Sequence, residues 1–300
     1  MLSRLTFLAS LSALTFAPPA LARERPSELL EAQILLDRAL HSPGVIDGKP
    51  GSNTRRAIAA FERAADLPVD GVLDQQLLQQ LRSGSPGPLL QDYVIAEEDA
   101  ARLTQVPAGM EGQSRLSHLG YESVVEALAE KFHMGQGLLR QLNPDTDFAV
   151  GNIIRVVSPG EDKLETAVAR IEIDKQASEL RAFDSDGMLV ASYPATIGSD
   201  AFPSPSGSME VRAVAAAPVY YFNPEGREWG PERKLTIAAG PNNPVGSTWI
   251  DLTRDGYGIH GSPDPRLIGK TGSHGCVRLT NWDAAELGEA VKQGASVTFL

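Results

Sequence analysis

Cysteine, basic charge and long apolar runs are all scarce in this sequence. Its 300 residues include one cysteine, Cys276, so no disulfide can form within the chain. Lysine and arginine total 27 against 38 aspartates and glutamates, which gives a net charge of -11. Such an acidic chain is a poor partner for nucleic acid or an anionic membrane, because both favour basic surfaces. No segment after residue 22 is long and apolar enough to cross a bilayer.

The first residues are typical of an export signal. Arg4 gives a short positive start, the apolar run Leu5–Ala17 follows, and Ala20–Ala22 is an A-x-A cleavage site. The run is short for a membrane span and Pro18 ends it, so cleavage is expected rather than retention as an anchor. Losing Arg4, the only charged residue of this segment, takes the net charge from -11 to -12. We expect a periplasmic protein, in which a lone thiol is a liability unless it takes part in chemistry.

The segment from Gly258 to Leu279 carries the most specific chemical signal. It contains Cys276 and two of the five histidines, His260 and His274. A thiol titrates at about 8.5, so a nucleophilic cysteine needs a nearby base to become a thiolate near neutral pH. Apolar residues flank a spacer rich in proline and glycine, which predicts two strand ends folded back on each other. Such a return brings the His260 ring toward the Cys276 sulfur, as nucleophilic catalysis requires.

The glycines of this segment predict an oxyanion hole. Glycine has no Cβ, so the N–H groups of Gly275 and Cys276 can approach a substrate carbonyl closely. Two other interpretations remain open. A lone cysteine is often a small buried hydrophobic residue, and Cys276, His260 and His274 together are three plausible zinc ligands. Paired Cys/His knuckles are missing, so the pattern favours catalysis without a metal.

Two short motifs in this segment carry a family resemblance. Ile259–Gly261 reads Ile-His-Gly, and Ser273–Leu279 reads Ser-His-Gly-Cys-Val-Arg-Leu. Together they resemble the active-site signature of the YkuD-type L,D-transpeptidases, bacterial enzymes that remodel peptidoglycan through a cysteine acyl-enzyme. The resemblance runs from about Ala169 to Leu300 and includes a strand pair at Ile171–Phe183 and turns at residues 202–207 and 240–246.

The resemblance implies a role for each matched residue. Cys276 is the nucleophile, His260 is the general base, and the carbonyl of Gly261 is the acceptor that orients the histidine ring. Arg278 and His274 line the donor site, where a guanidinium suits the free carboxylates of a stem peptide.

Three further residues have two interpretations each. Ser273 either adds a hydroxyl to the same cluster or caps a turn. Tyr221 and Trp229 belong to an aromatic loop near the position where the family has a flap over the donor site. They either contact the substrate or pack against the sandwich.

The implied activity is that of a cysteine acyltransferase acting on peptidoglycan stem peptides, with no cofactor, metal or nucleic acid. An amine of a second stem peptide resolves the thioester to give a cross-link, and an outer-membrane protein or lipoprotein is an alternative acceptor. Water in place of the amine gives an L,D-carboxypeptidase or hydrolase with the same nucleophile. A non-catalytic scaffold that binds peptidoglycan strands is the alternative from another class. It predicts a damaged site, whereas Cys276, His260, Gly275 and Arg278 are all present.

Residues 24–84 predict a compact module of three helices. The first covers Glu28–Leu40, Asn53 and Thr54 can cap the second, and Asp74 can cap the third. The order of two Asp-Gly turns around a helix with a central phenylalanine resembles the peptidoglycan-binding domain 1 family. Glycan binding is implied by that resemblance, and a helical spacer is the alternative.

Residues 85–106 are expected to form a linker, because Ser83–Pro88 is rich in glycine and proline. Residues 107–160 predict two helices, a Leu-Asn-Pro turn and the strand Ile153–Val157. This order resembles a degenerate LysM module. Its usual first strand, a Tyr-x-Val ahead of a Gly-Asp turn, is not recognisable in the sequence.

Residues 165–300 predict an all-β sandwich or barrel with one closing helix, because short alternating strands and turn signals recur at short intervals. Asn281 is the expected cap of a helix from Asp283 to Lys292, which Gly294 ends before a last strand from Ser296 to Leu300. The expected whole is a multidomain α+β chain. It consists of a signal peptide (1–22), a small helical module, a small LysM-like α/β segment and a C-terminal YkuD-type sandwich.

Overall fold

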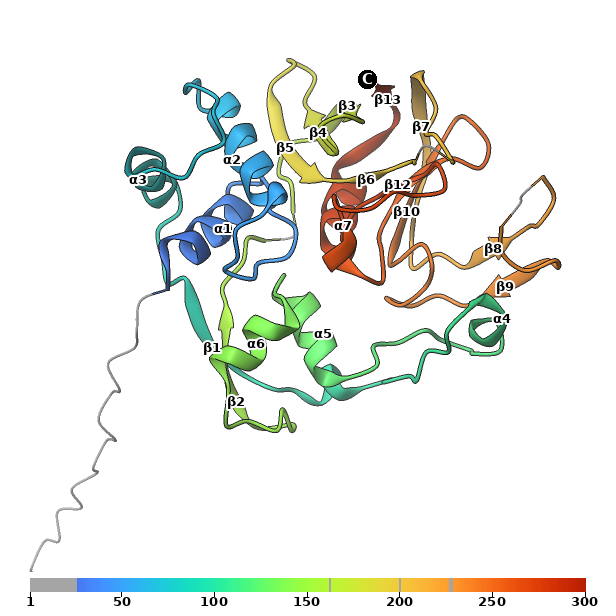
Figure 1. Cartoon of the computed structure of the whole chain (residues 1–300), viewed down its shortest axis with the longest axis horizontal. Helices are drawn as coiled ribbons and strands as arrows, with labels where there is room; N and C mark the ends of the chain where they lie inside the picture. Colours follow the sequence, from blue (N-terminus) through green and yellow to red (C-terminus); the bar gives the residue numbers. More distant parts are fainter. Residues whose placement is uncertain (1–25, 162, 200, 227–228) are drawn as a thin grey trace, which may run out of the picture.

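The computed structural model describes residues 26–161, 163–199, 201–226 and 229–300. The expected signal peptide, residues 1–22, lies outside these ranges. Figure 1 shows a helical N-terminal part and a C-terminal β-sheet, with a small α/β segment beside both. No helix of the described ranges is long and apolar enough to span a membrane.

The helical module consists of α1 (Glu28–Arg38), α2 (Ser52–Ala64) and α3 (Gln75–Gly84). Asp74 caps α3 as expected, since its carboxylate accepts from the Leu77 N–H at 2.8 Å. The expected caps of α2 were wrong, because the helix begins at Ser52, so Asn53 and Thr54 lie within its first turn and the cap is Gly51. The Asn53 side chain instead donates to the carbonyl of Ile268, in the C-terminal sheet region, at 2.9 Å.

Helix α1 is buried on two faces. One face, with Ala32, Leu35 and Leu36, packs with α2 and α3 in one hydrophobic cluster. The opposite face, with Leu30 and Ile34, packs in a second cluster whose other members come mainly from the middle segment. The helical module and the LysM-like segment therefore share a core.

The middle segment is a two-stranded sheet with helices between its strands. Its elements are β1 (Leu90–Val94), η1 (Glu97–Ala100), α4 (Met110–Gln113), α5 (Val124–Lys131), α6 (Gln136–Leu142) and β2 (Ile153–Val157). The prediction of a linker over residues 85–106 was wrong, because β1 lies within it and pairs antiparallel with β2. This strand is difficult to predict from the sequence, because its partner lies some sixty residues away and Gln91 and Asp92 interrupt its apolar pattern. The likeness to LysM stays a prediction.

The C-terminal part is built on one continuous sheet of nine strands in the order β5-β4-β3-β13-β7-β10-β11-β12-β6. The strands are β3 (Val168–Asp174), β4 (Glu179–Phe183), β5 (Leu189–Pro194), β6 (Thr196–Ile197), β7 (Gly207–Ala216), β10 (Thr248–Leu252), β11 (Gly258–His260), β12 (Val277–Arg278) and β13 (Val291–Phe299). Strand β7 belongs to both halves, pairing with β13 through residues 207–210 and with β10 through residues 211–216. Side chains of both halves meet in one core, which confirms the expected sandwich-like arrangement.

Three smaller elements complete this part: the hairpin β8 (Tyr220–Phe222) with β9 (Leu235–Ile237), the short helix η2 (Pro265–Leu267), and helix α7 (Asn281–Ala290). The closing helix was predicted correctly, but its limits were wrong. Thr280 is the cap, with its hydroxyl accepting from the Asp283 N–H at 3.1 Å. Gly294 lies inside β13, where its positive φ of 84° accompanies a shift in strand register.

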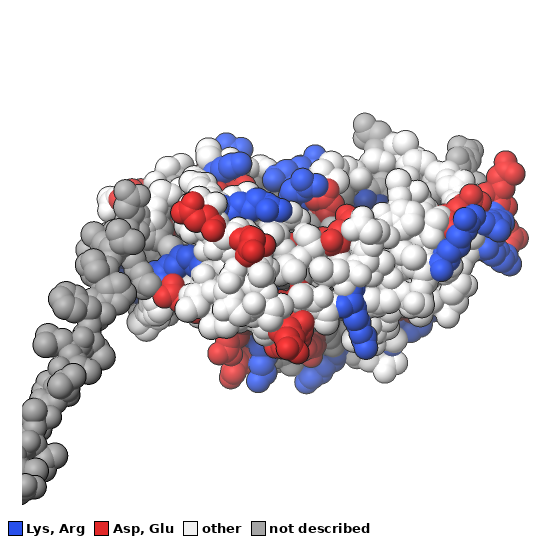
Figure 2. All heavy atoms as spheres, turned by 90° about the horizontal axis from the view of Figure 1, so that it is seen from below, with Lys and Arg blue, Asp and Glu red and all other residues white. Residues whose placement is uncertain are grey.

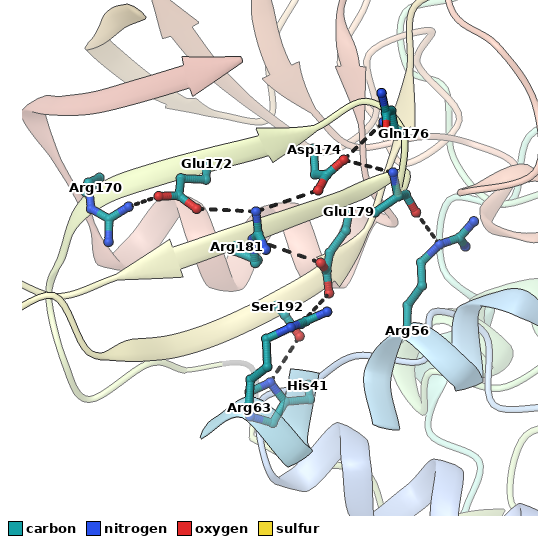
Figure 3. Close-up of polar contacts among 11 residues, drawn as sticks. His41, Arg56, Arg63, Arg170, Glu172, Asp174, Gln176, Glu179, Arg181 and Ser192 are labelled. Carbon is teal, nitrogen blue, oxygen red and sulfur yellow. Dashed lines mark hydrogen bonds and ion pairs between the residues drawn. The ribbon is translucent and has the colours of Figure 1, made fainter. Parts of the chain in front are cut away.

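The helical module packs against the edge of the sheet. Figure 3 shows Arg63 of α2 directed toward Glu179 at the start of β4, and the two form an ion pair of 3.6 Å. His41 Nδ1 lies 3.0 Å from the Ser192 hydroxyl on β5. Burial raises the pKa of Glu179, an effect that the nearby Arg63 and Arg181 oppose.

The middle segment also contacts the sheet region through a buried carboxylate. Both carboxylate oxygens of Glu130 accept from the Asn281 amide, at 3.0 Å each. Burial raises the pKa of Glu130 to about 7. On the face drawn in Figure 2, lysine and arginine side chains are interspersed with aspartate and glutamate side chains.

Candidate active site

Three neighbouring strands present alternate side chains to one face of the sheet. On β10, β11 and β12 the residues Ile250, Ile259 and Val277 are fully buried in the core. Since successive side chains of a strand point to opposite faces, their neighbours point the other way. These neighbours are Trp249, Asp251, Gly258, His260, Cys276 and Arg278.

The strand register brings the expected catalytic residues together. His260 pairs with Trp249 on one side and, in parallel register, with Arg278 on the other. Cys276 comes two residues before Arg278 and so lies on the same face. A pocket of about 780 Å³ opens over this face. Its lining includes Trp249, Asp251, His260, His274, Cys276 and Arg278, together with residues of the β8–β9 hairpin.

His260 is buried and held in one orientation. Its Nδ1 lies 2.7 Å from the carbonyl oxygen of Gly261. A carbonyl can only accept, so Nδ1 carries the proton and Nε2 is left as the basic nitrogen. The ring of Trp249 stacks on the imidazole with a centroid separation of 5.4 Å.

The environment of His260 favours the neutral imidazole. Burial, and then the positive charge of Arg278, lower its pKa to about 4. The ring is therefore uncharged at pH 7 and able to accept a proton. Burial also lowers the pKa of Arg278, while the nearby Cys276 acts in the opposite direction. The Cys276 thiol is partly exposed to the pocket and lies 3.6 Å from the carbonyl oxygen of Gly256.

Ser273 and Gly275 shape the loop before the cysteine and do not line the pocket. The Ser273 hydroxyl donates to the carbonyl of Cys276 at 2.5 Å and accepts from the Gly275 N–H at 3.1 Å. Ser273 is buried, so of the two interpretations from the sequence the structure supports the turn cap. The amide expected to serve the oxyanion hole from Gly275 is engaged by this serine. The other amide expected to serve the oxyanion hole is that of Cys276.

His274, Trp229 and Tyr221 line the pocket, and their contact with a substrate stays a prediction. The ring of His274 packs between Trp229, at a centroid distance of 4.1 Å, and Phe202, at 4.7 Å. Tyr221 on β8 is 72% exposed, so it is available to a ligand at the pocket mouth.

Two residues of this site, Trp249 and Gly258, were missed by the sequence analysis. A Cβ placed on Gly258 would lie 2.5 Å from the Trp249 ring, so this glycine makes room for the indole that stacks on His260. The alternation of Trp249 and Asp251 in a short strand was a usable signal, but their nearness to His260 depends on register across strands. Within the described ranges, no group of three or more histidine, cysteine, aspartate or glutamate side chains is arranged to hold a metal ion.

The model of the YkuD family, described as an L,D-transpeptidase catalytic domain, matches residues 168–298. This span contains the nine-stranded sheet apart from the last residue of β13, together with His260, Cys276 and Arg278. The chain carries an L,D-transpeptidase catalytic domain. A second model, described as a putative peptidoglycan binding domain, matches residues 25–81, which are the helical module.

Relatives named as L,D-transpeptidases extend this similarity beyond the catalytic domain. The putative L,D-transpeptidase YkuD of Bacillus licheniformis is 29% identical over 175 residues, which cover 58% of this chain and 92% of that protein. The probable L,D-transpeptidase YbiS of Escherichia coli is 28% identical over 188 residues, covering 60% of this chain and 61% of that one. Among solved structures, an L,D-transpeptidase from Mycobacterium smegmatis is 23% identical with a TM-score of 0.37, covering 51% of this chain and 64% of that chain.

Proposed function

We propose that this protein is an exported, periplasmic L,D-transpeptidase that acts on peptidoglycan stem peptides through a thioester on Cys276. One observation carries the proposal. The thiol of Cys276, the neutral imidazole of His260 and the guanidinium of Arg278 lie on one face of adjacent strands, at a pocket of about 780 Å³. The site thus has the nucleophile, the base and the anion-binding group that acyl transfer requires.

The first half-reaction forms the acyl-enzyme. His260 Nε2 takes the proton of the Cys276 thiol, and the sulfur attacks the carbonyl that precedes a terminal D-amino acid of the donor stem. The Cys276 N–H stabilises the developing oxyanion. The C–N bond then breaks, the leaving amine takes the proton from the imidazolium, and a thioester remains on Cys276. Arg278 holds a donor carboxylate through the two N–H directions of its guanidinium.

The second half-reaction depends on the acceptor. Attack by an amine of another stem peptide on the thioester forms a cross-link and releases the thiol. An amine of an outer-membrane protein or lipoprotein would instead attach that protein to the wall, and water would make the protein an L,D-carboxypeptidase. We favour the amine of a second stem, because the peptidoglycan-binding domain would keep the enzyme where neighbouring stems are concentrated.

The test is incubation of the purified protein with stem-peptide donors ending in a D-amino acid, followed by mass spectrometry of protein and products. We expect a mass increase on the protein equal to the acylating peptide, release of the D-amino acid, and a dimeric muropeptide when acceptor is added. Cys276→Ala should lose all three. Cross-linking by Cys276→Ala would overturn the mechanism, and release of the D-amino acid without a dimer would favour the carboxypeptidase.

A further inference from the structure

A segment outside both matched domains reaches the catalytic pocket. Residues 101–120, here called the strap, leave the middle segment after η1 and return to it before α5. Figure 1 shows α4, which lies within the strap, beside the β8–β9 hairpin and far from the helix that follows it. The strap therefore joins the middle segment to the hairpin that borders the site.

The C-terminal end of the strap is fixed to the chain that follows β9. The Leu119 N–H donates to the carbonyl of Ala239 at 3.0 Å, and the Leu119 carbonyl accepts from the Asn242 N–H at 3.1 Å. Leu119 is completely buried. A Cβ on Gly240 would lie 2.1 Å from the Leu119 carbonyl oxygen, so only glycine permits this approach. The Asn242 side chain adds a bond of 2.9 Å to the carbonyl of Gly120.

The middle of the strap touches the hairpin and the pocket. Glu111 of α4 forms an ion pair of 3.2 Å with Arg233, just ahead of β9. Both side chains are more than half exposed, so this pair adds little to the attachment. The next residue toward the N-terminus, Met110, lines the catalytic pocket itself, in company with Tyr221 and Trp229.

The two sides of the pocket differ in chemistry. The sheet supplies the polar groups His260, Cys276 and Arg278 beside Trp249 and two alanines, whereas the hairpin and the residues next to it supply mainly aromatic and aliphatic groups. Met110 is the strap's contribution to that apolar side. A methionine side chain is unbranched and polarizable, so it adapts to the aliphatic part of a bound peptide.

We propose that the strap holds the β8–β9 hairpin over the pocket and that Met110 is a specificity-determining residue, which contacts the aliphatic part of the donor peptide. The proposal rests on the L,D-transpeptidase function given above. Because Met110 lines the pocket but is not one of the groups proposed to react, it affects substrate binding more than the chemical step.

The first test measures acylation of Cys276 against the concentration of a stem-peptide donor, by intact mass. For Met110→Ala we expect a half-saturating concentration raised about five- to tenfold and a maximal rate within about twofold of the parent protein. Met110→Leu should restore the parent value, since it keeps most of the apolar volume. Met188→Ala is the matched control, because Met188 is 61% exposed in the turn before β5. A Met110→Ala protein that behaves like Met188→Ala would overturn the role of Met110.

The second test does not depend on activity and asks whether the strap holds the hairpin. Hydrogen exchange of the β8–β9 amides should be at least about tenfold faster in Gly240→Ala, whose added methyl group displaces Leu119, and detectably faster in Met110→Ala. Unchanged exchange in both variants would overturn the strap's role. If the parent protein is not acylated at all, the proposed function and the specificity role of Met110 both fail, while exchange still decides whether the strap holds the hairpin.

Discussion

Burial and the neighbouring positive charge of Arg278 keep His260 neutral, because both lower its pKa. Its pKa of about 4 lies below the usual 6.5, so acidification to pH 5 should leave most of the base unprotonated. We expect the second-order rate constant for acylation to fall on the acid side with a midpoint near pH 4, where the free enzyme's base titrates. A pH series of acylation rates measures this, and a midpoint near 6.5 would contradict it.

Arg278→Gln tests the cause of that low pKa. Removing the guanidinium charge removes one of the two effects that lower the pKa of His260. The acid limb should therefore move to higher pH in the variant, while burial keeps it below 6.5. Donor binding will weaken as well, so the position of the limb is the informative quantity and the absolute rate is not. An unmoved limb would mean that burial alone sets the pKa.

At the level of single residues, the sequence was sufficient to predict that Cys276 and His260 lie at one site. A lone cysteine two positions from an arginine, with a histidine in a paired strand, leaves few other interpretations. It was insufficient for Ser273, whose hydroxyl serves the loop backbone. It also could not reveal Met110, which reaches the pocket from a segment more than a hundred residues away from Tyr221. Such contacts depend on tertiary folding, which no local pattern records.

Strands β10 and β11 depend on one glycine for their packing. In Gly258→Ala the new Cβ would lie 2.5 Å from the Trp249 ring, which must then leave its stacked position on His260. We expect the free energy of unfolding to fall by about 1–3 kcal/mol through overpacking. Acylation should slow roughly 10–100-fold because the base is displaced. Denaturant titration and acylation kinetics measure the two effects.

Gly137→Ala is the control for that change. Gly137 lies in α6 and a Cβ there would meet no atom within 4 Å. The substitution should therefore leave acylation unchanged and raise stability by about 0.4–1 kcal/mol, through the lower entropy of the unfolded chain. If Gly258→Ala were equally harmless, the Trp249 ring would have no part in placing His260.

Element boundaries were harder to predict than element types. The closing helix was expected from its cap and stop signals, the strand pair β3–β4 from the family resemblance, and both were found. The end of α7 was misplaced because Gly294, a usual stop signal, produces an irregularity inside β13 instead. Strand β1 was missed because its strand partner is β2, which follows only after η1 and the three helices α4, α5 and α6.

The three parts of the molecule meet at a buried cluster of ionisable groups. Asp37 of α1 lies 3.1 Å from His133, whose ring stacks on Trp282 of α7 at a centroid distance of 5.0 Å. Beside them, Asp283 is fully buried, and burial raises its pKa to about 7 although Thr280 and Ser42 hydrogen-bond to it. The folded protein thus favours the neutral form of this carboxyl group.

Because of this cluster, we expect Asp283→Asn to stabilise the folded protein by an amount that depends on pH. The folded pKa exceeds the unfolded value, so the contribution of Asp283 to stability is fully present below about pH 4 and is lost as pH rises through 7. The asparagine does not titrate, and its advantage over the parent should grow from small at pH 4 to about 2–4 kcal/mol at pH 8. Thermal unfolding at several pH values measures this. Asp186→Asn, at an exposed turn, is the control for the same substitution outside the cluster.

Because the helical module and the middle segment share a core, removing the helical module should destabilise the rest of the chain. A chain that starts at residue 85 lacks Leu30, Ile34 and Ile46, all buried against the middle segment. We expect it to expose that apolar surface and to be insoluble or poorly folded when expressed. Circular dichroism and solubility test this. A soluble fragment with the thermal stability of the whole chain would show that the middle segment does not need α1.

Helix α1, buried on two faces, also bears on how such a protein could be assembled by gene fusion. A wall-binding cassette joined through a flexible tether can be exchanged for another without disturbing its neighbours. Here the exchange of residues 25–81 alone would also remove the side chains that α1 contributes to the hydrophobic core of the middle segment. Recombination that keeps a working protein should therefore carry residues 28–157 as one inherited block, and chimeras made within that block should need compensating changes around Leu30 and Ile34.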